Sequence, residues 1–255
     1  MGMHFFEGQK NNVVALMSEL TDGAMGSSTN DGPDGSDMFK RSRVRFLNRH
    51  GLNAAHMVMG GFAHGSNAAI VERAKYNGRV PDTDVLVTSE QQTILAGVSA
   101  DCFIVLAYFP GLFNTKLPGK SVVGLAHAGW KGIVGGVVPE LVHAMRSQGA
   151  FARDMMISVT PGVRDCCFVV KDDENGIRNF SGYTNFCRRD ERGRYHVNLP
   201  GILRRQLLDH GLDQGNIHIS EDCTACDKAK GKYFSWRRDG RPGGYQMLSL
   251  ISLRG

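Results

Sequence analysis

The segment SVVGLAHAGWKGIVGGVVPELVHAMRSQG, residues 121–149, decides the fold because its pattern changes from strand to helix within one stretch. Residues 121–130 form an apolar run that predicts a buried strand ending in a glycine-rich turn. An apolar stripe at helical spacing follows and predicts a helix that ends at Gly149. Pro139 removes a backbone donor, so it either kinks this helix or lies in the first turn of a helix that begins there. The stripe consists of Ile133, Val134, Val137, Val138, Leu141, Val142 and Met145.

Outward from this segment, further strand and helix patterns mix without regular alternation. Strand patterns cover residues 56–65, 85–88, two runs within 92–110, 155–162, 165–170, 216–220, 232–239 and 246–253. Helix patterns cover residues 38–52 and 198–212, and the charged residues 171–195 predict a surface excursion. We therefore expect an α+β fold, a single layered domain over residues 1–255 in which mixed β-sheets are flanked by helices. The chain contains neither GxGxxG nor a Walker A sequence, so it does not support a dinucleotide or P-loop site.

Residues 21–37 are polar and rich in Gly, Asp and Ser, and they predict a flexible loop. A loop of this length inside a domain is either functional or simply mobile, and the sequence leaves both interpretations open.

The composition is that of a globular protein. The 255 residues include 42% hydrophobic residues, and the net charge of +5 is dispersed, unlike that of a nucleic-acid-binding chain. The N-terminus has no basic region followed by an apolar run, and no stretch has the length of a membrane span. We expect a cytoplasmic monomer or homodimer that binds neither nucleic acid nor membrane, with its cysteines reduced.

Three residues of metal-ligand type, His64, Cys102 and His127, each fall at the end of a predicted strand beside a glycine or a turn. Strand ends are where functional groups gather in α/β folds. A catalytic zinc site uses three protein ligands and keeps a fourth position open, and a His, Cys, His set meets that requirement. On residue types alone, a buried core cysteine and two unrelated histidines explain the pattern better, because the three residues form no local motif.

Five motifs stand in a specific order: Asp84-Val-Leu-Val-Thr88, Ala100-Asp-Cys102, His127-Ala-Gly-Trp-Lys-Gly132, Cys223-Thr224 and Phe234-Ser-Trp-Arg-Arg-Asp-Gly240. From about residue 56 to the C-terminus, the chain resembles the family variously called YfiH-like, multicopper polyphenol oxidoreductase (laccase) and purine nucleoside phosphorylase. The resemblance implies a YfiH-like fold with His64, Cys102 and His127 as metal ligands. At the first ligand this chain has Phe62-Ala63-His64 where the family usually has Gln-Val-His.

The resemblance also implies a purine nucleoside and phosphate as partners and zinc as cofactor. The implied reactions are phosphorolysis of adenosine, inosine or methylthioadenosine, and deamination of adenosine. Cys102 and His127 are then catalytic, together with Asp101, the nearest carboxylate in the sequence, as a general base or as the group that orients His127. The H-x-E and P-C-x-x-C elements of the known zinc deaminases are absent, so deamination would use an unrelated site.

Phosphorolysis needs a basic pocket. Lys131 lies in a turn before a helix, where free backbone N–H groups hold phosphate in other proteins. Arg43, Arg237 and Arg238 are the further candidates, and strand alternation would place Arg237 and Arg238 on opposite faces. Trp130, in the same turn as Lys131, is expected to pack on the core.

Two alternatives remain. Copper-dependent oxidation of polyphenols needs several clustered, histidine-rich copper sites, and a Cys102–His127 hydrolase acting on cell-wall precursors would need no metal. The other cysteines favour ordinary buried residues, with one near the site, because adjacent Cys166 and Cys167 would point to opposite faces of a strand and so oppose a second zinc site. These cysteines are Cys166, Cys167, Cys187, Cys223 and Cys226.

Overall fold

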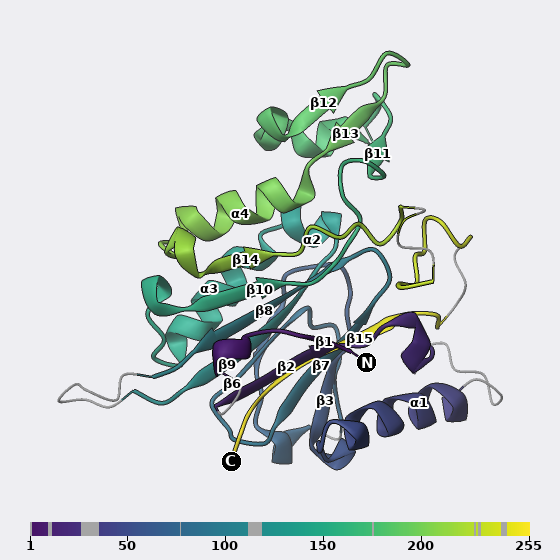
Figure 1. Cartoon of the computed structure of the whole chain (residues 1–255). Helices are drawn as coiled ribbons and strands as arrows, with labels where there is room; N and C mark the ends of the chain where they lie inside the picture. Colours follow the sequence, from purple (N-terminus) through teal and green to yellow (C-terminus); the bar gives the residue numbers. More distant parts are fainter. Residues whose placement is uncertain are drawn as a thin grey trace.

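The fold contains two six-stranded mixed sheets, a three-stranded sheet and four α-helices within the residues that the structure, a computed structural model, describes. Those residues are 2–9, 12–26, 36–76, 78–111, 119–174, 176–226, 228, 231–240 and 244–255. Figure 1 shows the two large sheets in the centre, α1 on one side, and α2, α3 and α4 on the other.

The strands of each sheet follow in spatial order. The first sheet contains β1 (Met3–His4), β2 (Val13–Met17), β15 (Met247–Leu253), β7 (Ile94–Ser99), β3 (Met57–Gly60) and β5 (Arg79–Val80). The second contains β14 (Ile217–Ile219), β10 (Met156–Val159), β8 (Phe103–Phe109), β9 (Val122–Ala128), β6 (Val85–Thr88) and β4 (Ala68–Ile70). The small third sheet contains β11 (Val169–Val170), β13 (Tyr195–Val197) and β12 (Cys187–Arg189). Parallel and antiparallel pairs occur in both large sheets, so the predicted α+β fold with mixed sheets is confirmed.

The α-helices are α1 (Ser36–Arg49), α2 (Trp130–Val134), α3 (Val137–Ser147) and α4 (Leu199–Asp209). Short 3-10 helices cover Glu7–Gln9, Leu20–Asp22, Ala54–His56, Arg73–Lys75, Ala152–Asp154, Ile177–Phe186 and Gln214–Asn216. None of the described helices is long and apolar enough to cross a membrane.

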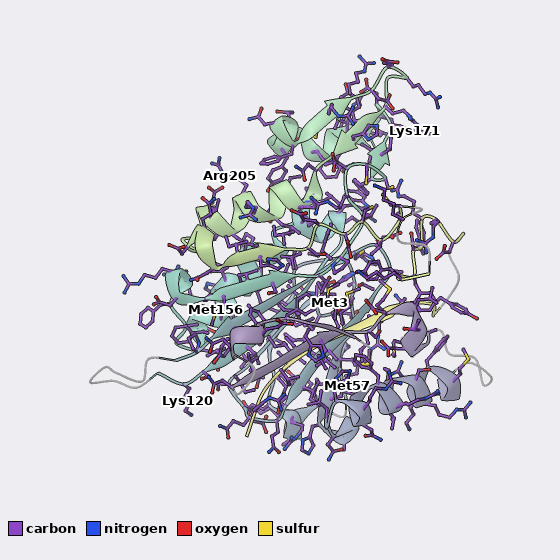
Figure 2. The ribbon with its side chains drawn as sticks, viewed as in Figure 1. Met3, Met57, Lys120, Met156, Lys171 and Arg205 are labelled. Carbon is purple, nitrogen blue, oxygen red and sulfur yellow. The ribbon has the colours of Figure 1, made fainter. Side chains whose placement is uncertain are left out.

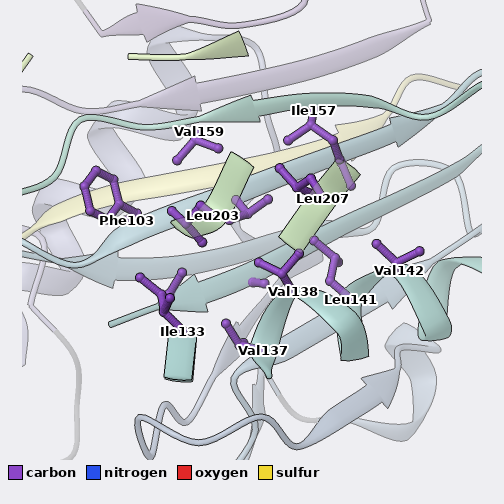
Figure 3. Packing of buried hydrophobic residues seen from close by; sticks show 14 of the residues in the cluster. Phe103, Ile133, Val137, Val138, Leu141, Val142, Ile157, Val159, Leu203 and Leu207 are labelled. Carbon is purple, nitrogen blue, oxygen red and sulfur yellow. The ribbon is translucent and has the colours of Figure 1, made fainter. Parts of the chain in front are cut away.

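Alternation along the central strands produces the layers. In β8 the side chains of Phe103 and Val105 belong to the core beneath α3 and α4, whereas those of Ile104 and Leu106 belong to the core between the two large sheets. Both faces of the second sheet are therefore covered, which explains why the strand at Phe103–Phe109 is buried throughout. Figure 3 shows α3 and α4 packed against this sheet. The outer face of the first sheet packs on α1 through a third cluster.

The segment at 121–149 forms the predicted strand, but two helices share the apolar stripe that was predicted as one helix. β9 is followed by α2, then by a break at Gly135-Gly136, and then by α3. Gly136 has φ of +89°, a left-handed backbone that glycine adopts without strain. Pro139 lies in the first turn of α3, where its missing N–H has no intrahelical partner to lose. The second of the two interpretations of Pro139 is therefore confirmed.

Charged side chains line the outward face of α4. Arg205 points away from the sheet in Figure 2 and pairs with Asp209 one turn later at 2.7 Å. Asn198 accepts a hydrogen bond from the backbone N–H of Gly201 and caps the helix.

One predicted strand is wrong, and another is shorter than predicted. Residues 232–239 lie outside every strand and contain a turn, and in the segment 165–170 only Val169–Val170 is a strand. The charged excursion at 171–195 contains a 3-10 helix and β12 of the small sheet, and β13 begins at its last residue. Lys171 lies beside this sheet in Figure 2. The loop predicted at 21–37 is described only at its ends, since α1 begins at Ser36 and residues 27–35 lie outside the described residues.

Truncation of Leu141 tests the packing of α3 on β9. Leu141 is fully buried, and a Cβ added at Gly124 of β9 would meet its Cδ1 at 2.8 Å, so the helix and strand are in close contact. Leu141→Ala is expected to lower the free energy of unfolding by about 2–5 kcal/mol in urea denaturation. The control Arg146→Ala removes an exposed side chain of the same helix and should change stability by less than about 0.5 kcal/mol. Equal unfolding midpoints for the two variants would contradict this packing.

Candidate metal centre

The register of three adjacent strands brings His127, Cys102 and Asp84 to one end of the second sheet. His127 on β9 pairs with Ile104 on β8, and Cys102 lies two residues before Ile104, on the same face. On the other side of β9, Val85 pairs with Ala126, and the backbone N–H of His127 donates to the carbonyl of Asp84 at 2.8 Å. Residues far apart in the sequence are therefore neighbours because of strand pairing.

Asp84 is the residue that organises this end of the sheet. Its buried carboxylate accepts a hydrogen bond from Nδ1 of His127 at 2.9 Å. It also accepts from the backbone N–H groups of Ala63, His64 and Gly65 at 3.1, 3.1 and 2.9 Å. Burial alone raises the pKa of Asp84, but the hydrogen bonds from His127 and the backbone outweigh it and hold the pKa below its ordinary value.

The protonation of His127 follows from Asp84. An ionised carboxylate has no proton to donate, so Nδ1 of His127 carries the proton of this hydrogen bond and Nε2 is left as the ring nitrogen available to a ligand. Asp84 thus places both histidines, His127 through its side chain and His64 through its backbone.

His64 and Asp101 both adopt a left-handed backbone, with φ of +61° and +82°. This region costs a non-glycine residue roughly 1–3 kcal/mol and is found at functional sites where the surroundings hold it. At His64 the holding group is Asp84. At Asp101 the holding groups are the hydroxyl of Thr224 and the backbone N–H of Arg237, each donating to the carboxylate at 2.7 Å.

Asp101 therefore does not orient His127. Its two carboxylate oxygens accept from Thr224 and Arg237, and its carbonyl accepts from the backbone N–H of Val163 at 2.8 Å. The carboxylate that contacts His127 is Asp84, which the sequence analysis quoted only as part of a motif. Asp101 instead fixes the backbone next to Cys102 and joins it to two other segments of the chain.

The arrangement fits a single metal ion. The ligand atoms of His64, Cys102 and His127 all lie within 4.8 Å of one another, with His64 exposed, Cys102 half-buried and His127 buried. Gly129 covers them: a Cβ at this position would lie 3.0 Å from Sγ of Cys102, 3.0 Å from Cδ2 of His64 and 3.8 Å from Cε1 of His127. Glycine therefore leaves open the space towards which the three side chains converge. Two imidazoles and a thiolate are also a donor set that zinc accepts.

Phe62 lies on the other side of His127. The two rings are stacked with centroids 4.3 Å apart and an angle of 5° between their planes. Phe62 fits because Gly60 and Gly97 leave no side chain where its ring lies; a Cβ at either position would collide with it. The phenylalanine that stands in place of the usual glutamine thus restricts rotation of the His127 ring.

Cys102 and His127 form a charged pair at this site. Burial by itself raises the pKa of Cys102, but the charge of His127 and hydrogen bonds from both histidines lower it to about 6. Burial by itself lowers the pKa of His127, but Cys102 and Asp84 raise it to about 9. The thiolate form of Cys102 is the one that a metal ion or an electrophile requires.

A cavity of about 840 Å³ opens above these residues. Its volume lies within the range of small-molecule sites. Its cationic side chains are Arg79, Lys131 and Arg237. Its aromatic side chains are Phe39, Phe62, Phe103, Phe168, Trp130, Trp236 and Tyr245. The centre therefore lies in a cavity with both stacking surfaces and positive charge.

Of the four predicted phosphate ligands, Lys131 and Arg237 line this cavity. The guanidinium of Arg237 lies 5.1 Å from the ring centroid of Phe168. Lys131 Nζ lies 5.7 Å from the ring centroid of Trp130, which packs on the core as predicted. Arg79, the first residue of β5, is a third cation of the cavity, and it lies in no motif that the sequence analysis singled out.

Arg43 and Arg238 lie elsewhere. The buried guanidinium of Arg43 donates to the backbone carbonyls of Met25 and Gly26 and does not line the cavity. Arg238 donates to the carbonyls of Thr224 and Tyr233, each at 2.7 Å. Only one of the Arg237–Arg238 pair faces the cavity, but the cause is a turn and not the alternation of a strand.

Residues 19–254 match the model of the family described as multi-copper polyphenol oxidoreductase laccase. The chain belongs to this family. It is 34% identical to purine nucleoside phosphorylase YlmD of Geobacillus stearothermophilus over 69% of this chain and 61% of that protein. It is 30% identical to purine nucleoside phosphorylase ORF3 of Streptomyces griseus over 88% of this chain and 86% of that protein.

The family fold is also seen in solved structures. The crystal structure of the hypothetical protein YfiH of Bacillus licheniformis aligns with a TM-score of 0.82 at 24% identity, covering 99% of this chain and 96% of that one. The match to the Geobacillus protein covers less than two thirds of that protein's length. The family model establishes the family of this chain, and it does not establish the activity.

A second group of possible metal ligands lies outside this centre and consists of Cys166, Cys167, Cys223 and Cys226. Cys166 and Cys167 do not point to opposite faces of a strand, as the sequence predicted, because residues 165–167 form a turn. Both thiols contact Sγ of Cys226, at 3.3 and 3.5 Å. The interpretation of these residues as ordinary buried cysteines does not account for this convergence.

Asp84→Asn tests the organising role of Asp84. The amide keeps the size of the side chain but places a donor among the four groups that donate to the carboxylate, so unfolding free energy should fall by about 1–3 kcal/mol. ¹⁵N NMR of the imidazoles at a pH above the His127 pKa of about 9, where the ring is neutral, should show that His127 loses its proton preference for Nδ1. The control Asp82→Asn, exposed and at a left-handed position that asparagine tolerates, should change stability by less than about 0.5 kcal/mol. Unchanged stability and tautomer in Asp84→Asn would refute this role.

Proposed function

We propose that this protein is a zinc-dependent purine nucleoside enzyme that cleaves adenosine, inosine or methylthioadenosine by phosphorolysis. The observation that carries the proposal is the convergence of His64, Cys102 and His127 in the floor of a cavity of about 840 Å³ that also holds cationic and aromatic side chains. Two relatives that bear the name purine nucleoside phosphorylase support an enzyme of this kind.

His64, Cys102 and His127 would hold the zinc ion. Three protein ligands leave a coordination position for water or substrate, and zinc would supply Lewis-acid chemistry there. The residues around the ligands prepare them for this role. Asp84 accepts the hydrogen bond from Nδ1 of His127, so Nε2 is the nitrogen that would bind the ion after it gives up its proton, and Gly129 leaves the space between the three side chains free.

The cavity has the two surfaces that a nucleoside and phosphate require. Trp236 and Tyr245 expose 47% and 43% of their area and can stack on a purine. Lys131 and Arg237 can hold phosphate through charge-assisted hydrogen bonds. In phosphorolysis a phosphate oxygen bonds to C1′ of the ribose, the C–N bond to the base breaks, and the base leaves with the bonding electrons and takes up a proton. Positioning the anion for that attack is the part that the two cations perform.

Deamination of adenosine is the second reaction that we assign to the same site. It replaces the amino group at C6 with oxygen from water and releases ammonia, without phosphate. Adenosine separates the two activities, because phosphorolysis yields adenine and deamination yields inosine.

A thiol hydrolase is the alternative that one observation favours. The lowered pKa of Cys102, produced against burial by the charge of His127 and by hydrogen bonds from both histidines, is also the condition of a nucleophilic cysteine. Such an enzyme would act on an amide such as those of cell-wall precursors and would need no metal. Copper-dependent oxidation of polyphenols is the other alternative, and it requires several clustered copper ions. One of the two groups of possible ligands among the described residues has no histidine at all.

Loss of Cys102 tests the proposed reaction. Purified protein supplied with zinc and phosphate is expected to release free base and ribose 1-phosphate from at least one of adenosine, inosine and methylthioadenosine, measured by chromatography. Cys102→Ala should lower kcat/KM by roughly 100-fold or more. Cys187→Ala is the matched control, because this half-buried cysteine lies on β12 and outside both groups of possible ligands, and it should leave kcat/KM unchanged.

Metal removal separates the alternatives. Dialysis against a chelator should abolish the nucleoside activity, and added zinc should restore it. Activity that persists without metal would overturn the zinc mechanism in favour of the Cys102 thiolate. Oxygen consumption with a phenol after copper addition, without nucleoside turnover, would instead establish the oxidase.

Arg237→Ala and Lys131→Ala test phosphate binding. Each removes a charge from the cavity wall, and each should raise the KM for phosphate by roughly tenfold or more while the KM for the nucleoside changes less. Arg188→Ala removes an exposed arginine of β12 and should leave both constants unchanged. Equal effects of Arg237→Ala and Arg188→Ala would rule out the assignment of Arg237.

A further inference from the structure

Four cysteines outside the candidate metal centre converge from two distant segments. Cys166 and Cys167 follow β10, and Cys223 and Cys226 follow β14. Their Sγ atoms all lie within 4.8 Å of one another, and the Sγ atoms of Cys166 and Cys167 lie 3.3 and 3.5 Å from that of Cys226. All four are free thiols in this structure.

These distances match a zinc tetrathiolate. With Zn–S bonds near 2.3 Å, tetrahedral geometry separates the four sulfur atoms by roughly 3.8 Å. The spacing within Cys223-Thr-Ala-Cys226 is also that of the paired ligands in zinc ribbons and related sites. We propose that Cys166, Cys167, Cys223 and Cys226 form a second metal site, which binds one Zn²⁺ through four thiolates. Each thiol gives its proton to solvent as it binds the ion, so no oxidant or reductant takes part.

Disulfide pairing explains the geometry less well. A disulfide needs its sulfur atoms at about 2.05 Å, and Cys226 can bond to only one of the two thiols that contact it. Disulfides would divide the four thiols into separate couples, whereas Cys226 contacts Cys166 and Cys167 alike. One ion uses all four thiols at once.

The backbone at Cys223 is arranged as it is around a thiolate ligand. Gly162 and Cys223 form an isolated parallel bridge, with the N–H of Thr224 donating to the carbonyl of Gly162 at 3.1 Å. The N–H of Arg164 points at Sγ of Cys223, 3.4 Å away. N–H groups directed at sulfur are the outer contacts that orient ligands and tune metal sites.

The site is structural because four protein ligands leave no position for a substrate. The position of the site in the fold shows which segments the metal ion would join. Figure 1 shows the segment after β14 running beside the segment between β10 and β11. From these two segments, Val163 donates its N–H to the carbonyl of Asp101, and Thr224 donates its hydroxyl to the carboxylate. A metal ion that joins the two segments would thus hold Asp101 in its left-handed backbone conformation, next to Cys102.

Metal content and cobalt spectroscopy test the second site. Protein purified under reducing conditions with zinc is expected to contain about two ions per chain, one in each group of ligands. The double variant Cys223→Ser/Cys226→Ser should lose one ion and keep the one that Cys102→Ala removes. The control Cys187→Ser should keep both. Because the double variant risks misfolding, the wild-type protein is also loaded with Co²⁺ alone. The sulfur-to-cobalt charge-transfer absorption grows with the number of thiolates, so a tetrathiolate should make it far more intense than the site with one thiolate and two imidazoles can.

Two results would overturn the second site. One is a wild-type protein that, supplied with excess zinc under reducing conditions, holds a single ion that Cys102→Ala removes. The other is a disulfide from Cys226 to Cys166 or Cys167, detected by mass spectrometry of alkylated, unreduced peptides from protein purified with reductant. Neither result bears on nucleoside cleavage, which is measured separately, so the second site and the proposed activity can fail independently.

Discussion

The hydrogen bond between buried Asp84 and Nδ1 of His127 is the interaction on which the site depends. It joins neighbouring strands at their ends, at a point where the register already places the two residues opposite each other. The same carboxylate holds the backbone of His64 in a left-handed conformation. A buried charge is tolerated here because four donors surround it, and removal of the charge would leave those donors without an acceptor.

The layers of the fold explain why this end of the sheet can hold a strained and charged site. The second large sheet is covered on one face by α3 and α4 and on the other by the first large sheet. Its central strands are therefore rigid, and the residues at their ends vary little in position. Glycines at 60, 97 and 129 then leave the space that the ring of Phe62 and the three ligand side chains need. The packing of the second large sheet therefore also sets the geometry of the site.

The errors of the sequence analysis have physical causes. Arg43 and Arg237 are equally basic in the sequence, but Arg43 is used to hold the backbone at Met25 and Gly26, whereas Arg237 reaches the cavity. Asp101 is next to Cys102 in the chain, yet its carboxylate points to Thr224, because a left-handed backbone turns it away from His127. Adjacent cysteines were assigned to a strand because apolar residues follow them, and a turn brings both thiols to Cys226 instead.

The sequence by itself determined the fold class, most strand and helix positions, and the identity of His64, Cys102 and His127 as a candidate set. Periodicity is local, and the motifs around these residues are contiguous, so both can be read along the chain. Only the tertiary structure decided that Asp84 is the carboxylate of this site, that Arg79 joins its cavity, and that four cysteines meet elsewhere. Each of these depends on which strands are neighbours, in what register, and on the path of turns between them. Hydrophobic pattern specifies that a strand is buried, but pairing over long sequence separations is settled by the packing of the whole chain.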